Sequence, residues 1–165
     1  MKASSPNVLD LLISQHRDVD RLIARLESGH GDRNAIFAEL ADKLVAHAAA
    51  EEMIFYPAVV AHRRSQLLEA VEEHLEIKRV VADMLALDPD SEIFKAKLAV
   101  LKEDLQHHAH EEEEQELFPK LRNEFSEDTL LALGNDVLVM FNCLVGNHSR
   151  NRVKKETARA ARLSS

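Results

Sequence analysis

Histidine and glutamate recur together in two similar stretches of the sequence. The first is HAAAEEMIFYP, residues 47–57, and the second is HAHEEEEQELFP, residues 108–119. Each begins with a histidine, continues through a glutamate pair and ends in an aromatic residue followed by proline. Imidazole nitrogens and carboxylate oxygens without thiolates suit iron, manganese or zinc rather than copper(I). The repeat therefore raises the hypothesis of a metal site built by two related segments.

Four long segments carry apolar residues at alternating steps of three and four, which is the period of an amphipathic helix. They span about 6–28, 33–61, 64–87 and 92–124, and a further apolar segment covers about 127–145. Ser5 and Pro6 are the predicted start of the first helix, and Ser126 is the predicted N-cap of the last. Because short connections between long helices make antiparallel neighbours, we predict an all-α fold: an up-and-down antiparallel four-helix bundle with an extra C-terminal helix.

The predicted organisation has two parts. Residues 1–125 form the bundle, and residues 126–165 form a C-terminal helix and a basic tail that packs on the bundle or extends from it. The tail SRNRVKKETARAARLSS carries six basic residues and one acidic residue, and it is expected to be frayed helix or disorder.

Each of the four long segments has a histidine on its apolar seam, and these are His16, His47, His74 and His108. His16 and His74 precede the turns at positions 29 and 88, while His47 and His108 follow the turns at positions 32 and 91. Each histidine is roughly 13–17 residues from its turn, so at about 1.5 Å per residue all four lie roughly 20–25 Å from the same end of the bundle. A single such histidine is usually a hydrogen-bonded core residue, but four at one height indicate a shared site.

Two glutamates belong to the same predicted layer. Glu51 lies one helical turn after His47 and faces the same way. A buried carboxylate costs several kcal/mol unless it is paired or bound to a metal, and Lys78 is the only cation on the four seams. In the fourth segment, a regular turn from His108 favours Glu112. That segment has one extra residue before its proline, and a π-bulge that absorbs it would favour Glu113 instead. The regular helix, and so Glu112, is slightly preferred.

Composition excludes several classes of protein. The net charge of −8 argues against nucleic acid as the main partner, because binding to phosphates needs a basic surface. The single cysteine, Cys143, rules out an internal disulfide and fits a reducing compartment, so a cytoplasmic location is predicted. The first ten residues contain no apolar signal region, and no stretch of about 18 uncharged apolar residues predicts a membrane span.

The stretches that contain these histidines resemble the hemerythrin-like (HHE cation-binding) domains. The resemblance covers about residues 7–122 and rests on QHRDVDRLI, HAAAEEMIFYP, EEHLEIKRV and HHAHEEEEQELFP. It implies an oxo- or hydroxo-bridged pair of iron ions with two bridging carboxylates and terminal histidines. By motif, the implied metal ligands are His16, His47, Glu51, His74, His108 and one of Glu112 and Glu113. Family roles include oxygen binding, oxygen or nitric oxide sensing, iron handling and peroxide removal.

One departure from the family pattern shapes the functional prediction. Oxygen-carrying hemerythrins have a second histidine one turn after that of the third helix, and here the position is Lys78. The resemblance therefore predicts a non-haem di-iron protein with an open metal position for oxygen, nitric oxide or peroxide. Manganese and zinc fit the same donors, and no residue outside the metal site is assigned to catalysis. The alternative is a metal-regulated or metal-free helical interaction module, with LLALGNDVLVMFNCLV (130–145) covering the bundle or pairing two copies as a homodimer.

Overall fold

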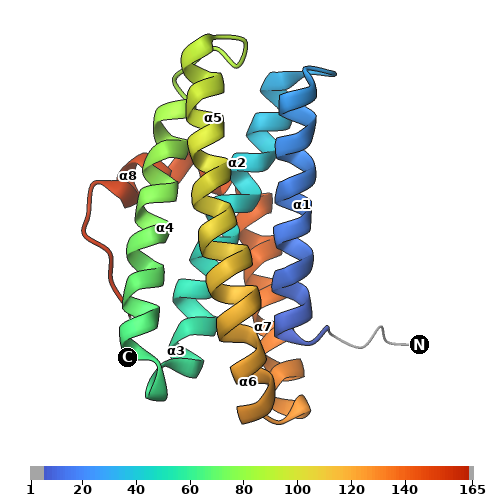
Figure 1. Ribbon diagram of the computed structural model, residues 1–165, viewed down its shortest axis with the longest axis vertical. Coiled ribbons are helices and arrows are strands. Elements are labelled where there is room, and N and C mark those ends of the chain that lie inside the picture. The colour runs from blue at the N-terminus through green and yellow to red at the C-terminus, as the bar shows by residue number, and fades with distance from the viewer. Residues whose placement is uncertain (1–5, 164–165) are drawn as a thin grey trace.

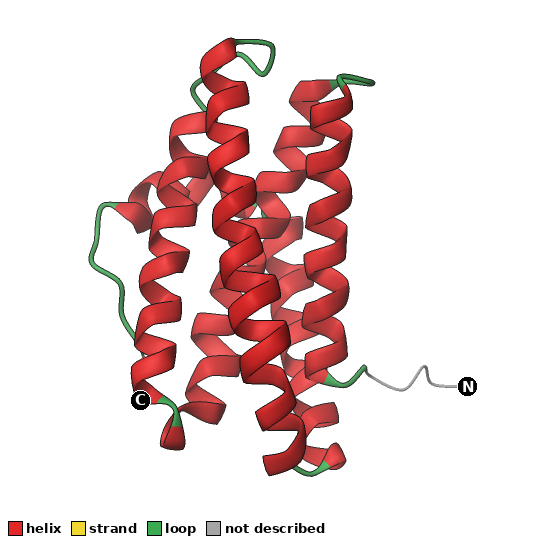
Figure 2. Ribbon diagram, viewed as in Figure 1, coloured by secondary structure: helices red, strands yellow, loops and turns green. Residues whose placement is uncertain are grey.

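The computed structural model describes residues 6–163, and every regular element in that range is a helix (Figure 2). Four long helices stand side by side along the long axis (Figure 1). They are α1 (Val8–Ser28), α2 (Arg33–Ala50), α4 (Arg64–Met84) and α5 (Glu92–Leu105). The fold is an all-helical bundle, as predicted. α1 and α4 agree with the predicted segments to within a few residues, whereas α2 and α5 reach the predicted ends only together with the segments that extend them.

Two of the long helices continue through irregular turns. α2 is extended by η1 (Glu51–Phe55), α3 (Tyr56–Val59) and η2 (Val60–His62). α5 is extended by η3 (Gln106–Leu117) and α6 (Phe118–Glu124). Both η1 and η3 are π-helical, so the histidine–glutamate stretches lie where the helix widens.

Local sequence signals explain most of the helix ends. The side chain of Asn7 accepts a hydrogen bond of 2.9 Å from the Leu9 N–H, so α1 begins two residues later than predicted. The predicted cap at Ser5 lies outside the described residues. Gly29 adopts a left-handed conformation with φ of 72° and ends α1. Ser126 caps the helix that begins at Glu127, as predicted, by accepting a hydrogen bond from the Thr129 N–H at 3.2 Å.

Two apolar clusters fill the bundle, one toward each end of the long helices. The first includes Leu26, Leu40 and Phe94, and the second includes Leu9 and Phe118. Between the two clusters lie six buried polar residues, each at most 5% exposed: His16, His47, Glu51, His74, His108 and Glu113. The histidines that the turn distances place at one height therefore do lie in one layer.

The C-terminal part of the described chain packs on the outside of the long helices. α7 (Glu127–Gly146) lies against α1 and α2, and a Cβ atom added at Gly134 would lie 1.9 Å from the Pro6 carbonyl oxygen. η4 (Ser149–Arg152) contacts α2, and α8 (Val153–Thr157) contacts α4. Among the described residues, α7 is the one helix long and apolar enough, by length and composition alone, to cross a membrane. A helix that packs against a bundle can have the same length and apolar composition, so this finding alone does not indicate a membrane span.

The expectation of a frayed or disordered tail is wrong for residues 149–157. The Ser149 hydroxyl donates a 2.6 Å hydrogen bond to the Asp42 carbonyl oxygen, and the Arg150 N–H donates to the Asp42 carboxylate at 3.0 Å. Val153 is fully buried in the apolar cluster that includes Leu26. Hydrogen bonds to one buried carboxylate and an apolar anchor outweigh the mutual repulsion of the basic side chains.

Candidate metal centre

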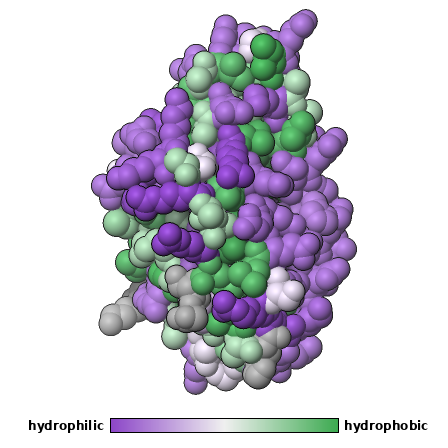
Figure 3. Space-filling model, turned by 90° about the vertical axis from the view of Figure 1, so that its left-hand side faces the viewer, coloured by the Kyte–Doolittle hydropathy of each residue, from purple (hydrophilic) through white to green (hydrophobic). Residues whose placement is uncertain are grey.

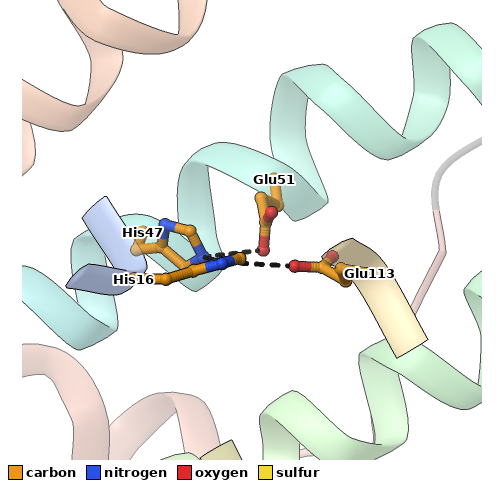
Figure 4. A group of neighbouring side chains, drawn as sticks. All are labelled: His16, His47, Glu51 and Glu113. Carbon is orange, nitrogen blue, oxygen red and sulfur yellow. Dashed lines mark hydrogen bonds and ion pairs between the residues drawn. The ribbon is translucent and has the colours of Figure 1, made fainter. Parts of the chain in front are cut away.

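The first group of converging side chains comes from three helices. His16 of α1, His47 of α2, Glu51 of η1 and Glu113 of η3 point toward one another (Figure 4). One donor atom from each lies within 4.8 Å of all the others. The two Nε2 atoms of His16 and His47 are 3.2 Å apart, His16 Nε2 is 3.3 Å from Glu113 Oε2, and His47 Nε2 is 3.3 Å from Glu51 Oε2.

A second group, formed by His74 and His108, shares Glu51 with the first group, and Glu113 lies at its edge. His74 Nε2 lies 2.9 Å from His108 Nε2 and 3.2 Å from Glu51 Oε2. His108 Nε2 lies 3.8 Å from Glu113 Oε1, the other oxygen of the carboxylate that approaches His16. Glu51 and Glu113 thus stand between two pairs of histidines. Two bound ions could share both carboxylates, each with two imidazole nitrogens.

The outer nitrogen of every histidine has its own hydrogen-bond partner. The Nδ1 atoms contact carboxylate or amide oxygens at 2.6–3.0 Å, in the pairs His16–Glu114, His47–Gln15, His74–Glu52 and His108–Glu73. A neutral imidazole that donates from Nδ1 carries its lone pair on Nε2. Metal-binding histidines in proteins are held in the same way. The four inward Nε2 atoms are therefore oriented to give electron pairs to a cation.

The buried carboxylates fit a cation as well. Glu51 is completely buried, and its Oε1 atom has no hydrogen-bond partner among the described residues. Burial and the neighbouring Glu113 raise the pKa of Glu51 well above its usual value. Burial also opposes ionisation of Glu113, but His108, His16 and His47 outweigh it and hold the pKa of Glu113 far below normal. Four imidazoles and two carboxylates with an unsatisfied oxygen match the donor set of a pair of first-row metal ions.

The two π-helical segments bring the glutamates into this layer. The Tyr56 N–H donates to the Glu51 carbonyl oxygen, and the Phe118 N–H donates to the Glu113 carbonyl oxygen, each five residues back. Pro57 and Pro119 follow these residues. Since proline lacks an N–H and its ring crowds the carbonyl four residues earlier, a wider turn before it relieves the conflict.

The slight preference for Glu112 as the fourth-helix ligand rested on a regular helix, and the structure has a π-helix there instead. The π-helical turn after His108 brings Glu113 into the buried group with His16, His47 and Glu51, whereas Glu112 lies with His108 and Glu73 in a partly buried group at the edge of the layer. The Glu112 side chain is 23% exposed and lies 3.1 Å from the exposed ring of His107. Burial and the nearby Glu73 raise the pKa of Glu112 to about 7. Glu112 therefore belongs to the rim of the cluster.

Tyr56 is a buried residue of the cluster that the sequence patterns did not single out. Its hydroxyl donates a 2.8 Å hydrogen bond to Glu113 Oε1 and lies 3.4 Å from both Glu51 Oε2 and His74 Nε2. Burial and Glu113 raise the pKa of Tyr56 well above its usual value, so it stays a donor. The sequence did contain a signal for this residue. Tyr56 precedes Pro57 at the position where the second stretch has Phe118, so a hydroxyl replaces a purely apolar ring end there.

Lys78 does not reach either shared carboxylate. Its ammonium group lies 2.9 and 3.0 Å from the two carboxylate oxygens of Glu52, which in turn accepts from His74 Nδ1. Glu52 is only partly exposed because it bridges these two side chains of α4. Lys78 therefore acts on the cluster through Glu52 and His74.

The helical fold and the histidine–glutamate cluster define a cation-binding helical domain. The family model of the hemerythrin HHE cation-binding domain matches residues 7–121, and the chain belongs to this family. A curated relative, the DNA nickase of Nostoc sp. (strain PCC 7120 / SAG 25.82 / UTEX 2576), is 28% identical over 125 residues, which are 74% of this chain and 35% of that protein. The chain thus spans about a third of the relative's length. No solved structure matches the chain significantly.

Proposed function

We propose that this chain is a non-haem di-iron protein that binds oxygen, nitric oxide or peroxide. The observation that carries the proposal is the convergence of four inward Nε2 atoms on two shared buried carboxylates. His16 and His47 would hold one ion, His74 and His108 the other, and Glu51 and Glu113 would contact both. Iron supplies the redox chemistry when bound, while manganese or zinc would occupy the same donors without changing the fold.

A small cavity beside the histidines supports a ligand of very few atoms. Its volume is about 20 Å³, and all four histidines line it together with apolar residues that include Val19, Leu44, Ile77 and Leu105. A cavity of roughly 10–15 Å³ is enough for one water molecule. Its apolar lining favours a small, weakly hydrated molecule and excludes larger substrates.

The number of histidine ligands supports an open position on the metal. Oxygen carriers of the family have a histidine where this chain has Lys78, and the Lys78 ammonium is held by Glu52. Each proposed ion therefore has two histidines from this chain. We propose two parts for the chain: residues 1–125 as the up-and-down four-helix bundle that supplies these ligands, and residues 126–165 as a C-terminal helix and basic tail that packs on the bundle or extends from it.

The test is the metal content and visible spectrum of protein purified in air, before and after addition of azide. We expect two iron ions per chain and an absorption band that azide shifts. Adjacent histidines of one helix make a matched pair: His108→Ala should lose iron and the band, and His107→Ala, which changes an exposed side chain, should keep both. Zinc alone, or no metal, with a featureless spectrum would overturn the di-iron proposal.

A second candidate function is pairing of two copies through α7. Val139 on this apolar helix is 63% exposed, and most of α7 is not buried by the rest of the described chain. Pairing through α7 would cover this surface. Light scattering should report a dimer that Val139→Asp converts to a monomer, and a metal-regulated module would change its oligomeric state when a chelator removes the ions. A monomer under all conditions would exclude this function.

The binding partners and the cellular location of the protein remain predictions. The net charge of −8 still disfavours nucleic acid as the partner of this chain, although the relative from Nostoc carries the name DNA nickase. A cytoplasmic location is proposed from the single cysteine, and cell fractionation tests it.

A further inference from the structure

A second, much larger pocket lies between α4 and the C-terminal segment. Its volume is about 520 Å³, within the range of roughly 300–1,000 Å³ that is common for small-molecule sites. Met53, Val71 and Leu75 contribute apolar surface on one side. Residues 151–162 of η4, α8 and the chain that follows close the other side. Figure 3 faces this side of the molecule, where apolar surface is bordered by hydrophilic side chains.

The charges that line this pocket are unbalanced. Five cationic side chains contribute to it, against two carboxylates, Glu52 and Glu156. Both carboxylates already have partners: Glu52 contacts Lys78 and His74, and Glu156 lies 3.7 Å from Arg152 and 3.9 Å from Lys78. The other cations have no acidic partner in the described part of the chain, and they are Lys155, Arg159 and Arg162.

This local excess of positive charge runs against the rest of the molecule. The chain has a net charge of −8, yet one pocket is surrounded by three cations that have no acidic partner within residues 6–163. Their mutual repulsion is relieved when an anion enters, and arginine presents paired N–H groups that match phosphate and carboxylate oxygens. Lys78, which is 6% exposed and paired with Glu52, also lines the pocket but adds no unpaired charge to it.

We propose that this pocket binds a small organic anion, in which an apolar group is joined to a phosphate or carboxylate. Val71 and Leu75 would contact the apolar group, while Arg159, Arg162 and Lys155 would contact the anionic group. The volume accommodates a molecule far larger than the ligands proposed for the histidine cluster. The pocket lies outside the layer of histidines but adjoins it, because Glu52 lines the pocket and also contacts His74.

The test is titration calorimetry of the full chain with phenyl phosphate, and with inorganic phosphate and phenol as its two parts. Benzoate, added in a separate titration, distinguishes a carboxylate from a phosphate preference. We expect phenyl phosphate to bind at least about tenfold more tightly than either part. Arg159→Ala and Arg162→Ala should each weaken it about tenfold, as expected for loss of one charge-assisted contact.

The matched control is Lys154→Ala, which removes one exposed positive charge from α8 outside the pocket and should leave binding unchanged. Absence of binding by phenyl phosphate and benzoate, or an equal loss in all three variants, would overturn the proposal. A short DNA duplex is a further probe. If it binds more tightly than phenyl phosphate, and if Lys154→Ala weakens its binding as much as Arg159→Ala does, the surface binds polyanions in general and the proposal is overturned. Metal content is measured on the same samples, so that a failure of anion binding can be distinguished from a failure of the di-iron proposal.

Discussion

At the level of single residues, the cluster is controlled by what the outer nitrogen of each histidine contacts. Three histidines donate to carboxylates, whereas His47 donates to the neutral amide of Gln15 at 2.7 Å. A carboxylate partner makes an imidazole a stronger electron donor than an amide does. The two proposed ions are therefore unequal, and the ion beside His47 has the weaker set of nitrogen donors.

The neighbouring glutamates of the fourth long helix provide a first residue-scale prediction. Glu113→Gln removes a buried, shared carboxylate and should lower metal affinity more than about 100-fold, because loss of even an outer partner costs roughly 10- to 100-fold. Glu112→Gln makes the same chemical change one residue earlier and should keep the metal. Metal analysis and thermal unfolding of both variants measure the effect, and equal metal loss in the two would contradict the assignment.

A second residue-scale prediction concerns pH. Burial lowers the pKa of His16, but the carboxylates of Glu113 and Glu114 outweigh it and raise the pKa to about 9. At neutral pH the metal-free protein therefore holds a proton on His16 that must leave before Nε2 can bind an ion. Affinity for zinc, measured by competition with a chromophoric chelator, should rise by up to about tenfold per pH unit below pH 9 and level off above it. A flat profile would show that His16 is already neutral.

The sequence alone predicted that the four histidines share one layer, but it did not predict which side chains contact them. Turn distances fix the height of a residue on a helix, so His16, His47, His74 and His108 could be placed in one layer. The contacts of Glu52 and Gln15 reach from one helix to another, and they depend on side-chain directions that no spacing encodes. The contact of Tyr56 could not be predicted for the same reason, because its hydroxyl donates a hydrogen bond to Glu113 on another helix.

At the level of elements, the two π-helical segments determine which glutamate faces the metal layer. The extra residue between His108 and Pro119 was visible in the sequence, and its absorption in a π-helix was one of two alternatives. The segment Glu51–Phe55 was not foreseen, because the second stretch was compared with the first as if the first were regular. Both segments end shortly before a proline, which is the physical signal they share.

Two single-residue deletions test this element-scale account. Removing exposed Glu111 restores the His–Glu spacing of the first stretch, so the helix can tighten while His108 and Glu113 stay on one face. Removing exposed Gln115 leaves that spacing but moves the buried pair Leu117 and Phe118 out of register. We expect the first variant to keep both metal ions and the second to lose them, as measured by metal analysis and circular dichroism. The reverse order would contradict the role assigned to the π-helix.

At the level of the whole molecule, a buried carboxylate fastens the C-terminal segment to the long helices. Asp42 is 6% exposed and accepts hydrogen bonds from the backbone and guanidinium of Arg150, with His148 at 3.3 Å. The sequence predicted the helix over 127–145 from its period but missed this attachment. Its contacts join residues more than a hundred positions apart, and His148 reaches them from a left-handed conformation with φ of 51°.

Replacing this carboxylate provides the whole-molecule prediction. Asp42→Ala should cost about 1–3 kcal/mol of stability, because partly buried donors of Arg150 and neighbouring groups lose their acceptor. Limited trypsin digestion should then cleave at Arg150 and Arg152 faster than in the unchanged protein. Asp18→Ala, which removes a more exposed carboxylate paired with Arg21, is the control and should not change that cleavage. Unaltered digestion of Asp42→Ala would show that Val153 holds the segment without this contact.

The polar layer between the two apolar clusters has a consequence for the lifetime of the protein. Ionisable side chains interrupt the core at mid-height, so without ions the two halves are joined by a layer that contains unsatisfied buried oxygens. Each half can then open on its own, at a free energy below that of global unfolding. Proteases act on such partly opened states. If the proposed ions bind, a cell short of iron would clear this protein faster than a cell with ample iron, and abundance itself would follow metal supply.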